Sequence, residues 1–117
     1  MFATDLILQK IQSLGGVKGC LVISVDGLVI DSIFSESLDK DLISALVSSI
    51  YNETAKQSGR INREKPKIII METDDSVLTI IQLIVDKEIL NVFTEFKKGL
   101  DTTQIVEALR TVTNSFK

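Results

Sequence analysis

Histidine is absent from the 117-residue chain, and cysteine and proline occur only once each. The lack of histidine removes the commonest general base and the commonest transition-metal ligand together. The lone Cys20 cannot form an intramolecular disulfide, and its place inside an apolar run is typical of a small buried side chain. These absences exclude most familiar catalytic sites and favour a reducing compartment.

The chain also lacks an excess of positive charge and any long hydrophobic run. Thirteen lysines and arginines against sixteen acidic residues give a net charge of -3, so no overall positive field attracts nucleic acid or anionic lipid. No apolar stretch reaches the roughly 20 residues that span a bilayer, and the N-terminus has no signal-peptide pattern. We expect a cytoplasmic protein with no nucleic-acid partner and no direct membrane insertion, folded as a single domain over residues 1–117.

Patterns for metal, nucleotide or cofactor binding are missing as well. The glycines fit neither the phosphate loop nor the dinucleotide fingerprint. Asp74 and Asp75 fall in one expected turn and Asp86 in the next, about 25 Å away at the other end of a strand, so turn chemistry explains them better than a metal site. Arg60 and Arg63 could be proposed as an arginine finger, a guanidinium that stabilises charge on a transferring phosphate. Charged residues are also common in solvent-exposed connecting loops, and this explanation is sufficient for both arginines. We expect no catalytic residue, no metal and no cofactor.

Apolar periodicity predicts eight elements in the order α-β-β-α-β-β-β-α. Helices are expected at residues 2–14, 40–58 and from 101 onward, a hairpin at residues 21–33 followed by a loop at residues 35–37, and strands at residues 67–73, 77–85 and 89–96. Asp26-Gly27 predicts a two-residue type I′ turn, Asp39 and Asp101 are expected N-caps, and Gly59 is expected to end the long helix. The strands are apolar on both faces and joined by short turns. The sequence therefore predicts an α/β fold of the α+β type, with one layer of five antiparallel strands covered by helices on both faces.

Each expected helix has an apolar side that would pack on the sheet. The residues of this side are Ile7, Leu8, Ile11 and Leu14 in the first helix, Leu42, Ile43, Leu46, Val47 and Ile50 in the long helix, and Ile105, Ala108, Leu109, Val112 and Phe116 in the last. The other side of the long helix would then expose small, weakly charged residues together with Tyr51. Small residues permit close approach of another protein and tyrosine is enriched in interfaces, although an ordinary solvated surface is an equally good interpretation.

Two positions in the later strands carry further expectations. Gln82 lies in an apolar strand and needs a hydrogen-bond partner, which we expect in a loop or helix end, with a ligand pocket as the alternative. The run of apolar residues at 68–71 would be hazardous as an open sheet edge, because unpaired backbone groups template further pairing. If this strand lies at an edge, it needs a partner.

The first hairpin also carries a family resemblance. Its residues are Gly16-Val17-Lys18-Gly19, an apolar run, and then Asp26-Gly27-Leu28-Val29-Ile30-Asp31-Ser32. This order resembles the Roadblock family, which is named after a dynein light chain and includes small-GTPase regulators and scaffold subunits. The resemblance implies a sheet with the first and last helices on one face and the long helix on the other. It also implies a homodimer joined at the third strand, with the two long helices side by side as a platform for partners.

Carried over by position, the resemblance assigns residues to two surfaces. The implied dimer interface comprises Lys67, Ile68, Ile69, Ile70, Met71, Glu72, Thr73 and Tyr51. The implied partner-binding surface comprises Ser44, Ala45, Ser48, Asn52 and Ala55. The leading hypothesis is a homodimeric, non-enzymatic regulator or scaffold that binds a small Ras-like GTPase and modulates its nucleotide cycle.

Two alternatives remain open. One is a structural adaptor that clamps a segment of a larger complex without contacting a GTPase. The other is a sensory module that binds a small ligand between sheet and helix. An oversized pocket around Gln82 would favour the sensory module, whereas a dense core and a flat helical platform would favour the first two hypotheses.

Overall fold

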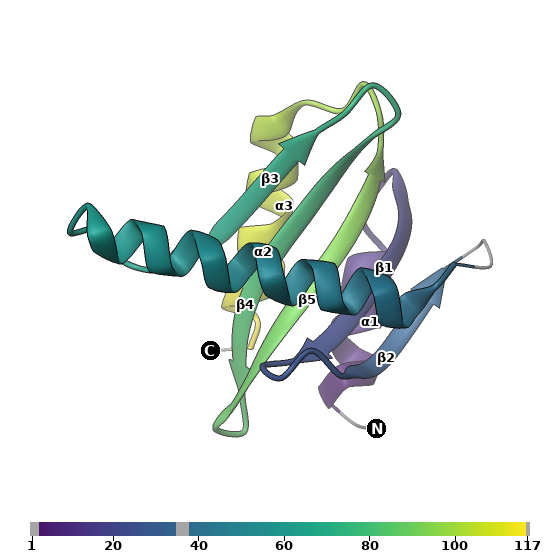
Figure 1. The fold of residues 1–117 in the computed structure, drawn as a ribbon. Coiled ribbons are helices and arrows are strands. Elements are labelled where there is room, and N and C mark those ends of the chain that lie inside the picture. Colours follow the sequence, from purple (N-terminus) through teal and green to yellow (C-terminus); the bar gives the residue numbers. More distant parts are fainter. Residues whose placement is uncertain (1–2, 35–37, 117) are drawn as a thin grey trace.

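The computed structural model of the protein describes residues 3–34 and 38–116, and it contains one five-stranded antiparallel sheet with strand order β2-β1-β5-β4-β3 (Figure 1). The elements are α1 (Ala3–Gln12), β1 (Val17–Ser24), β2 (Val29–Phe34), α2 (Lys40–Arg60), β3 (Ile68–Glu72), β4 (Ser76–Val85), β5 (Glu88–Lys97) and α3 (Thr102–Asn114). This architecture confirms the predicted fold class and element order.

Helices cover both faces of the sheet, as its apolar strands require. Helices α1 and α3 pack on one face, where Ile7, Ile11 and Leu109 are fully buried, and α2 crosses the other face (Figure 1). Neighbouring strand residues alternate between the two cores, so that Val22 contributes to the α1–α3 side and Leu21 to the α2 side. The predicted apolar sides of the first and last helices are confirmed, except that Leu14 and Phe116 pack on the same core from just beyond the ends of α1 and α3.

The helix ends agree with the sequence only in part. The side chains of Asp39 and Asp101 cap α2 and α3 as predicted; Asp39 accepts a hydrogen bond from the backbone of Leu42 at 3.0 Å. The expectation that Gly59 ends α2 was wrong, because the helix continues to Arg60 and the chain reverses at Asn62, whose φ is 57°. The predicted loop at residues 35–37 and the first residue of the predicted first helix lie outside the described residues.

Two of the three hairpin turns, β1–β2 and β4–β5, differ from each other in geometry. The type I′ turn predicted at Asp26-Gly27 was wrong, because only Gly27 has a positive φ, of 89°, and its N–H donates to Ser24 O at 3.0 Å. This is a three-residue loop closed by a glycine. The pair Asp86-Lys87 instead has φ values of 52° and 69°, the two positive angles that a type I′ turn requires.

Strands β2 and β3 form the two edges of the sheet. The pairing of β2 with β1 is irregular between Val22 and Ile23, and Asp31 of β2 is half-buried beside α1. Strand β3 is regular but short, and it pairs only with residues 77–81 of β4. The last four residues of β4, residues 82–85, therefore extend past β3 with no strand on that side.

Replacing Gly27 with alanine should lower the free energy of unfolding by about 1–2 kcal/mol, because the new side chain would enforce strain at a left-handed φ. It would also place a Cβ 3.1 Å from Ser48 Oγ. The matched control is Gly59→Ala, where a Cβ meets nothing within 4 Å in a helix, and it should raise stability by about 0.5 kcal/mol. Urea denaturation measures the free energy of unfolding of both variants. Equal changes at Gly27 and Gly59 would contradict the assigned loop geometry.

Candidate protein-binding surfaces

The outer edge of β3 exposes unpaired backbone groups. At the end of this strand, the Thr73 N–H donates to Ser76 O at 2.9 Å, across the turn and toward β4. Backbone groups alternate in direction along a strand, so every second residue of β3 directs its N–H and C=O away from β4. The residues with outward backbone groups are therefore Ile68, Ile70 and Glu72.

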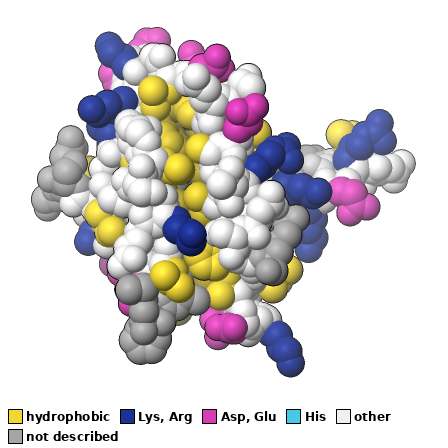
Figure 2. Space-filling model, turned by 180° about the vertical axis from the view of Figure 1, so that it is seen from behind, with side chains coloured by type: hydrophobic (Ala, Val, Ile, Leu, Met, Phe, Trp, Pro, Cys, Tyr) yellow, Lys and Arg dark blue, Asp and Glu magenta, His cyan; other side chains and the backbone are white. Residues whose placement is uncertain are grey.

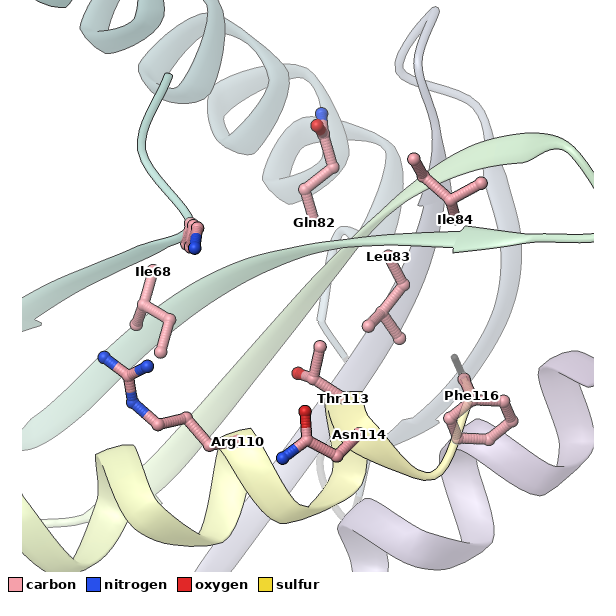
Figure 3. Close-up of a pocket in the computed structure, with 9 residues that line it drawn as sticks. Ile68, Gln82, Leu83, Ile84, Arg110, Thr113, Asn114 and Phe116 are labelled. Atoms are coloured by element: carbon pink, nitrogen blue, oxygen red, sulfur yellow. The ribbon is translucent and has the colours of Figure 1, made fainter. Parts of the chain in front are cut away.

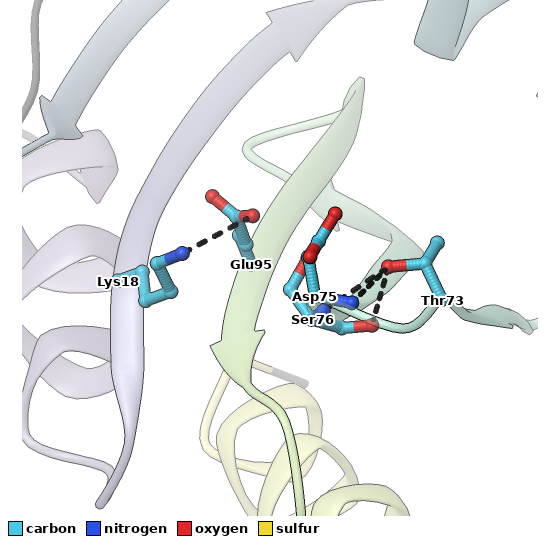
Figure 4. A network of polar contacts seen from close by, with 5 residues as sticks. All are labelled: Lys18, Thr73, Asp75, Ser76 and Glu95. Carbon is cyan, nitrogen blue, oxygen red and sulfur yellow. Dashed lines mark hydrogen bonds and ion pairs between the residues drawn. The ribbon is translucent and has the colours of Figure 1, made fainter.

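The turn that follows β3 is held by its own side chains (Figure 4). Thr73 Oγ1 accepts hydrogen bonds from the backbone N–H groups of Asp75 and Ser76, each at 3.1 Å. The turn formed by β4 and β5 lies at the opposite end of β4 (Figure 1). The expected separation of the acidic turns is confirmed, and their carboxylates do not form one site.

Helix α2 is longer than the part of the sheet it covers. Its 21 residues span about 31 Å, and the last buried residue along the helix is Tyr51. The C-terminal half protrudes past β3, the last strand on that side (Figure 1). The underside of the protruding half carries Ala55 and Ser58, which are half-buried.

The predicted orientation of α2 was wrong in part. Ser44 and Ser48, expected on the outer surface, face the sheet with exposed fractions of 0% and 8%, whereas Leu42 and Leu46, expected in the core, are 56% and 54% exposed. Val47 is buried, and Ile43 and Ile50 are half-buried against the same core, as predicted. The helix is thus rotated so that its small polar residues point inward and two of its leucines point outward.

The physical reason for this orientation is the close approach of the first hairpin. Ser44 Oγ donates a hydrogen bond to Gly27 O, and Gly27 lies against Ser48. Larger side chains at these helix positions would hold the hairpin away from α2. The small residues do permit close approach of another backbone, but that backbone belongs to the same chain.

Tyr51, assigned to the dimer interface, is buried, and its hydroxyl donates to Pro66 O at 3.1 Å. Burial also raises the pKa of this hydroxyl, which keeps it protonated as a donor. The bond ties α2 to the start of β3. Among the assigned partner-binding residues, only Ala45 and Asn52 are exposed, while Ala55 is half-buried.

The exposed surface of α2 therefore has a different composition from the one predicted. We define the α2 outer surface as Leu42, Ala45, Leu46, Ser49 and Asn52, all of which are exposed. Leu42 and Leu46 are one helical turn apart and form an apolar pair. The two leucines were missed because hydrophobicity alone assigned them to the core.

A hollow of about 500 Å³ lies at the free end of β4, beside α3 (Figure 3). Its apolar wall includes Leu83 and Phe116, and Arg110 reaches across it toward Ile68. Gln82 points to the other face of the sheet, where its amide donates to Asn91 Oδ1 of β5 at 3.4 Å. The predicted partner of Gln82 is thus a neighbouring strand and neither a loop nor a helix end.

Comparison with known proteins identifies the fold. The family model for the Roadblock/LC7 domain matches residues 3–94. The chain belongs to the Roadblock/LC7 family. Uncharacterized protein MJ0310 of Methanocaldococcus jannaschii is 28% identical over 87 residues, which are 66% of this chain and 76% of that protein.

Solved structures agree with this assignment at the level of the fold. Myxococcus xanthus MglB superposes with a TM-score of 0.81 at 11% identity, over 97% of this chain and 91% of MglB. A Roadblock/LC7 domain from Streptomyces avermitilis gives a TM-score of 0.74 at 18% identity, over 95% of this chain and 92% of that domain.

Chemically reactive groups are scarce in this Roadblock/LC7 domain. Burial raises the pKa of the Cys20 thiol to about 12, and the thiol accepts a hydrogen bond from Thr94 Oγ1 at 3.8 Å, so Cys20 is a buried core residue as predicted. Residues 3–34 and 38–116 contain no group of three or more histidine, cysteine or acidic residues that is arranged to hold a metal. None of the helices in these two ranges combines the length and apolarity needed to cross a bilayer.

Replacing Ser48 with arginine should lower the free energy of unfolding by at least about 2 kcal/mol, because a long charged side chain would be forced between α2 and the hairpin. The matched control Ser49→Arg changes the adjacent exposed residue and should stay within about 0.5 kcal/mol of wild type. Ser48→Ala removes a buried hydroxyl that has no hydrogen-bond partner among residues 3–34 and 38–116, and it should be neutral or stabilising. Thermal and urea unfolding test all three variants. A Ser48→Arg protein as stable as wild type would show that Ser48 lies on the exposed side of α2, as the sequence predicted.

Proposed function

We propose that this Roadblock/LC7 domain is a homodimeric, non-enzymatic regulator or scaffold that binds a small Ras-like GTPase and modulates its nucleotide cycle. In this proposal, the GTPase hydrolyses its nucleotide with its own catalytic groups, because the chain has no histidine and no phosphate loop. The protein acts by contact with the GTPase in the cytoplasm, a reducing compartment that suits its single free cysteine.

The observation that carries the homodimer is the combination of a free apolar edge with a protruding helix. Strand β3 offers three outward backbone positions, and its apolar residues are only half-buried. A second copy added to this edge would extend the sheet beneath the protruding half of α2 and cover its underside. A single contact would thus pair the free backbone groups of β3 and cover the underside of α2. This supports Lys67 to Thr73 as the dimer interface.

The α2 outer surface supports partner binding. Leu42 and Leu46 expose an apolar pair beside the small side chains of Ala45 and Ser49. In a dimer joined at β3, two such surfaces would lie on the same face of the extended sheet. This arrangement is the two-helix platform that the family resemblance implies, with the leucines replacing the inward-facing Ser44 and Ser48 as contact residues.

The hollow beside α3 favours a second candidate function, the binding of a small ligand. Its volume of about 500 Å³ falls within the range of ligand pockets, and Arg110 and Lys67 at its rim would select an anion. Stabilisation of the protein by small organic carboxylates in a thermal-shift assay would support this function. If none of these carboxylates changes the melting temperature, GTPase binding remains the better supported function.

The dimer is tested by Ile70→Pro, which removes an outward N–H donor from β3 and leaves the ladder to β4 intact. By symmetry two bonds are lost, so we expect the dimer to weaken by about 2 kcal/mol, or roughly thirtyfold in Kd. Ile69→Pro is the comparison, because its N–H faces β4 and its loss should destabilise the fold itself. Light scattering and urea unfolding separate the two effects, and a wild-type monomer at micromolar concentration would refute the dimer.

Partner binding is tested by Leu46→Arg on the α2 outer surface. The variant should retain wild-type stability within about 0.5 kcal/mol and lose at least tenfold in affinity for a cognate GTPase, because a buried apolar contact is replaced by a charge. Leu6→Arg on α1, where the leucine is 38% exposed on the opposite face, is the matched control. Pull-downs with GDP- and GTP-loaded Ras-like GTPases provide the measurement, and equal binding by both variants would move the functional surface elsewhere.

A further inference from the structure

The two ends of β3 carry opposite charges. Lys65 and Lys67 precede the strand, and Glu72 ends it, followed by Asp74 and Asp75 in the turn. In the part of the chain that the structure describes, the only ion pair joins Lys18 and Glu95 at 3.8 Å (Figure 4). The charges at both ends of β3 are therefore available to a partner.

Antiparallel pairing of β3 with its own copy brings these opposite charges together. Full overlap of the five-residue strand sets Ile70 opposite Ile70 of the second copy. Ile68 then lies opposite Glu72 of that copy, and both belong to the set of residues whose backbone groups point outward. The register needed for backbone pairing thus also sets the basic end of one strand beside the acidic end of the other.

The side of the sheet on which Glu72 would lie follows from the alternation along β3. Ile68 and Ile70 pack into the α1–α3 core, and Glu72 is on the same side because it is two residues further on. Residues directly opposite in an antiparallel pair share a face. Glu72 of the second copy therefore arrives next to Ile68 on the α3 side, at the rim of the hollow.

Arg110 occupies this position in the structure. Its guanidinium extends from α3 toward Ile68, and both residues line the hollow (Figure 3). On the face of the molecule opposite α2, several basic side chains lie on the β3 side, where α2 protrudes, and others lie near the centre and at the opposite margin (Figure 2). Arg110 has no carboxylate partner within the described residues.

We propose that the rim of this hollow is a recognition site for a second copy of the chain, in which Arg110 binds the carboxylate of Glu72 from that copy. The inference rests on the homodimer proposed above and adds the residues that select its register and its partner. Two-fold symmetry forms the pair twice in each dimer. A chain with the same apolar edge but without an acidic residue at the end of its strand would be recognised less well.

The chemistry of the guanidinium makes the pair selective. Arg110 is exposed at the rim of the hollow, where a charge-assisted hydrogen bond to a carboxylate is stronger than one between neutral groups and a like charge is repelled. The planar guanidinium of Arg110 also carries several N–H donors, which can bind both oxygens of one carboxylate. The site therefore favours a carboxylate held at a fixed register over a mobile acidic loop.

The test is a charge exchange. Arg110→Glu and Glu72→Arg should each weaken the homodimer at least tenfold, because each places like charges at both copies of the pair. An equimolar mixture of the two variants should form a heterodimer of wild-type affinity, since one site then holds the native pair and the other the exchanged pair. A chain that carries both changes should recover the homodimer. Lys10→Glu, on the exposed side of α1, is the matched control and should leave the dimer unchanged.

Native mass spectrometry of one isotope-labelled and one unlabelled variant reads out these species, and circular dichroism verifies that each variant is folded. Recovery of dimer affinity in the mixture of the two variants supports the ion pair. If one single variant does not fold, the dimer affinity of the chain that carries both changes still tests the pair. A wild-type dimer that neither single change weakens refutes the pair and leaves the homodimer standing. Weakening without recovery also refutes the pair. A monomeric wild-type protein removes the homodimer and this inference together.

Discussion

The central constraint in this molecule is a sheet that is apolar on both faces. Helices α1 and α3 together cover one face, but the other face has only α2, which crosses the strands and continues beyond β3. At the β3 side, α2 overhangs the sheet on one face, and a hollow remains beside α3 on the other. The free strand, the protruding helix and the hollow all lie at this side of the sheet.

The fold could be predicted from the sequence because its signals are local and repeated. The unbroken apolar strands required helices on both faces, and the helical spacing of Ile7 and Ile11 and of Ile105 and Leu109 identified the residues that pack there. The position of β3 at an edge is different, because strand order depends on contacts between distant segments. It came only from the family resemblance, and the structure agrees with it.

The orientation of α2 could not be predicted from hydrophobicity, because a contact distant in sequence determines it. Leu42 and Leu46 are the more apolar residues, yet Ser44 and Ser48 face the sheet because they are small enough for the hairpin and one of them binds its backbone. The spacing of the serines at i and i+4 was a signal of close packing, and the error lay in assigning that packing to another protein. The three-residue loop of residues 25–27 lies against the same part of α2, with Gly27 beside Ser48.

The irregular strand β2 has a consequence for the size of any assembly. Its broken register next to Val22 and its half-buried Asp31 make it a poor template for a further strand, whereas β3 pairs in a regular register and is mostly apolar. In the proposed dimer, joining two chains at β3 would use the regular edge of each chain and leave β2 at each margin of the doubled sheet. Polymerisation would then terminate after one step, so the exposed β3 edge would not lead to a fibre.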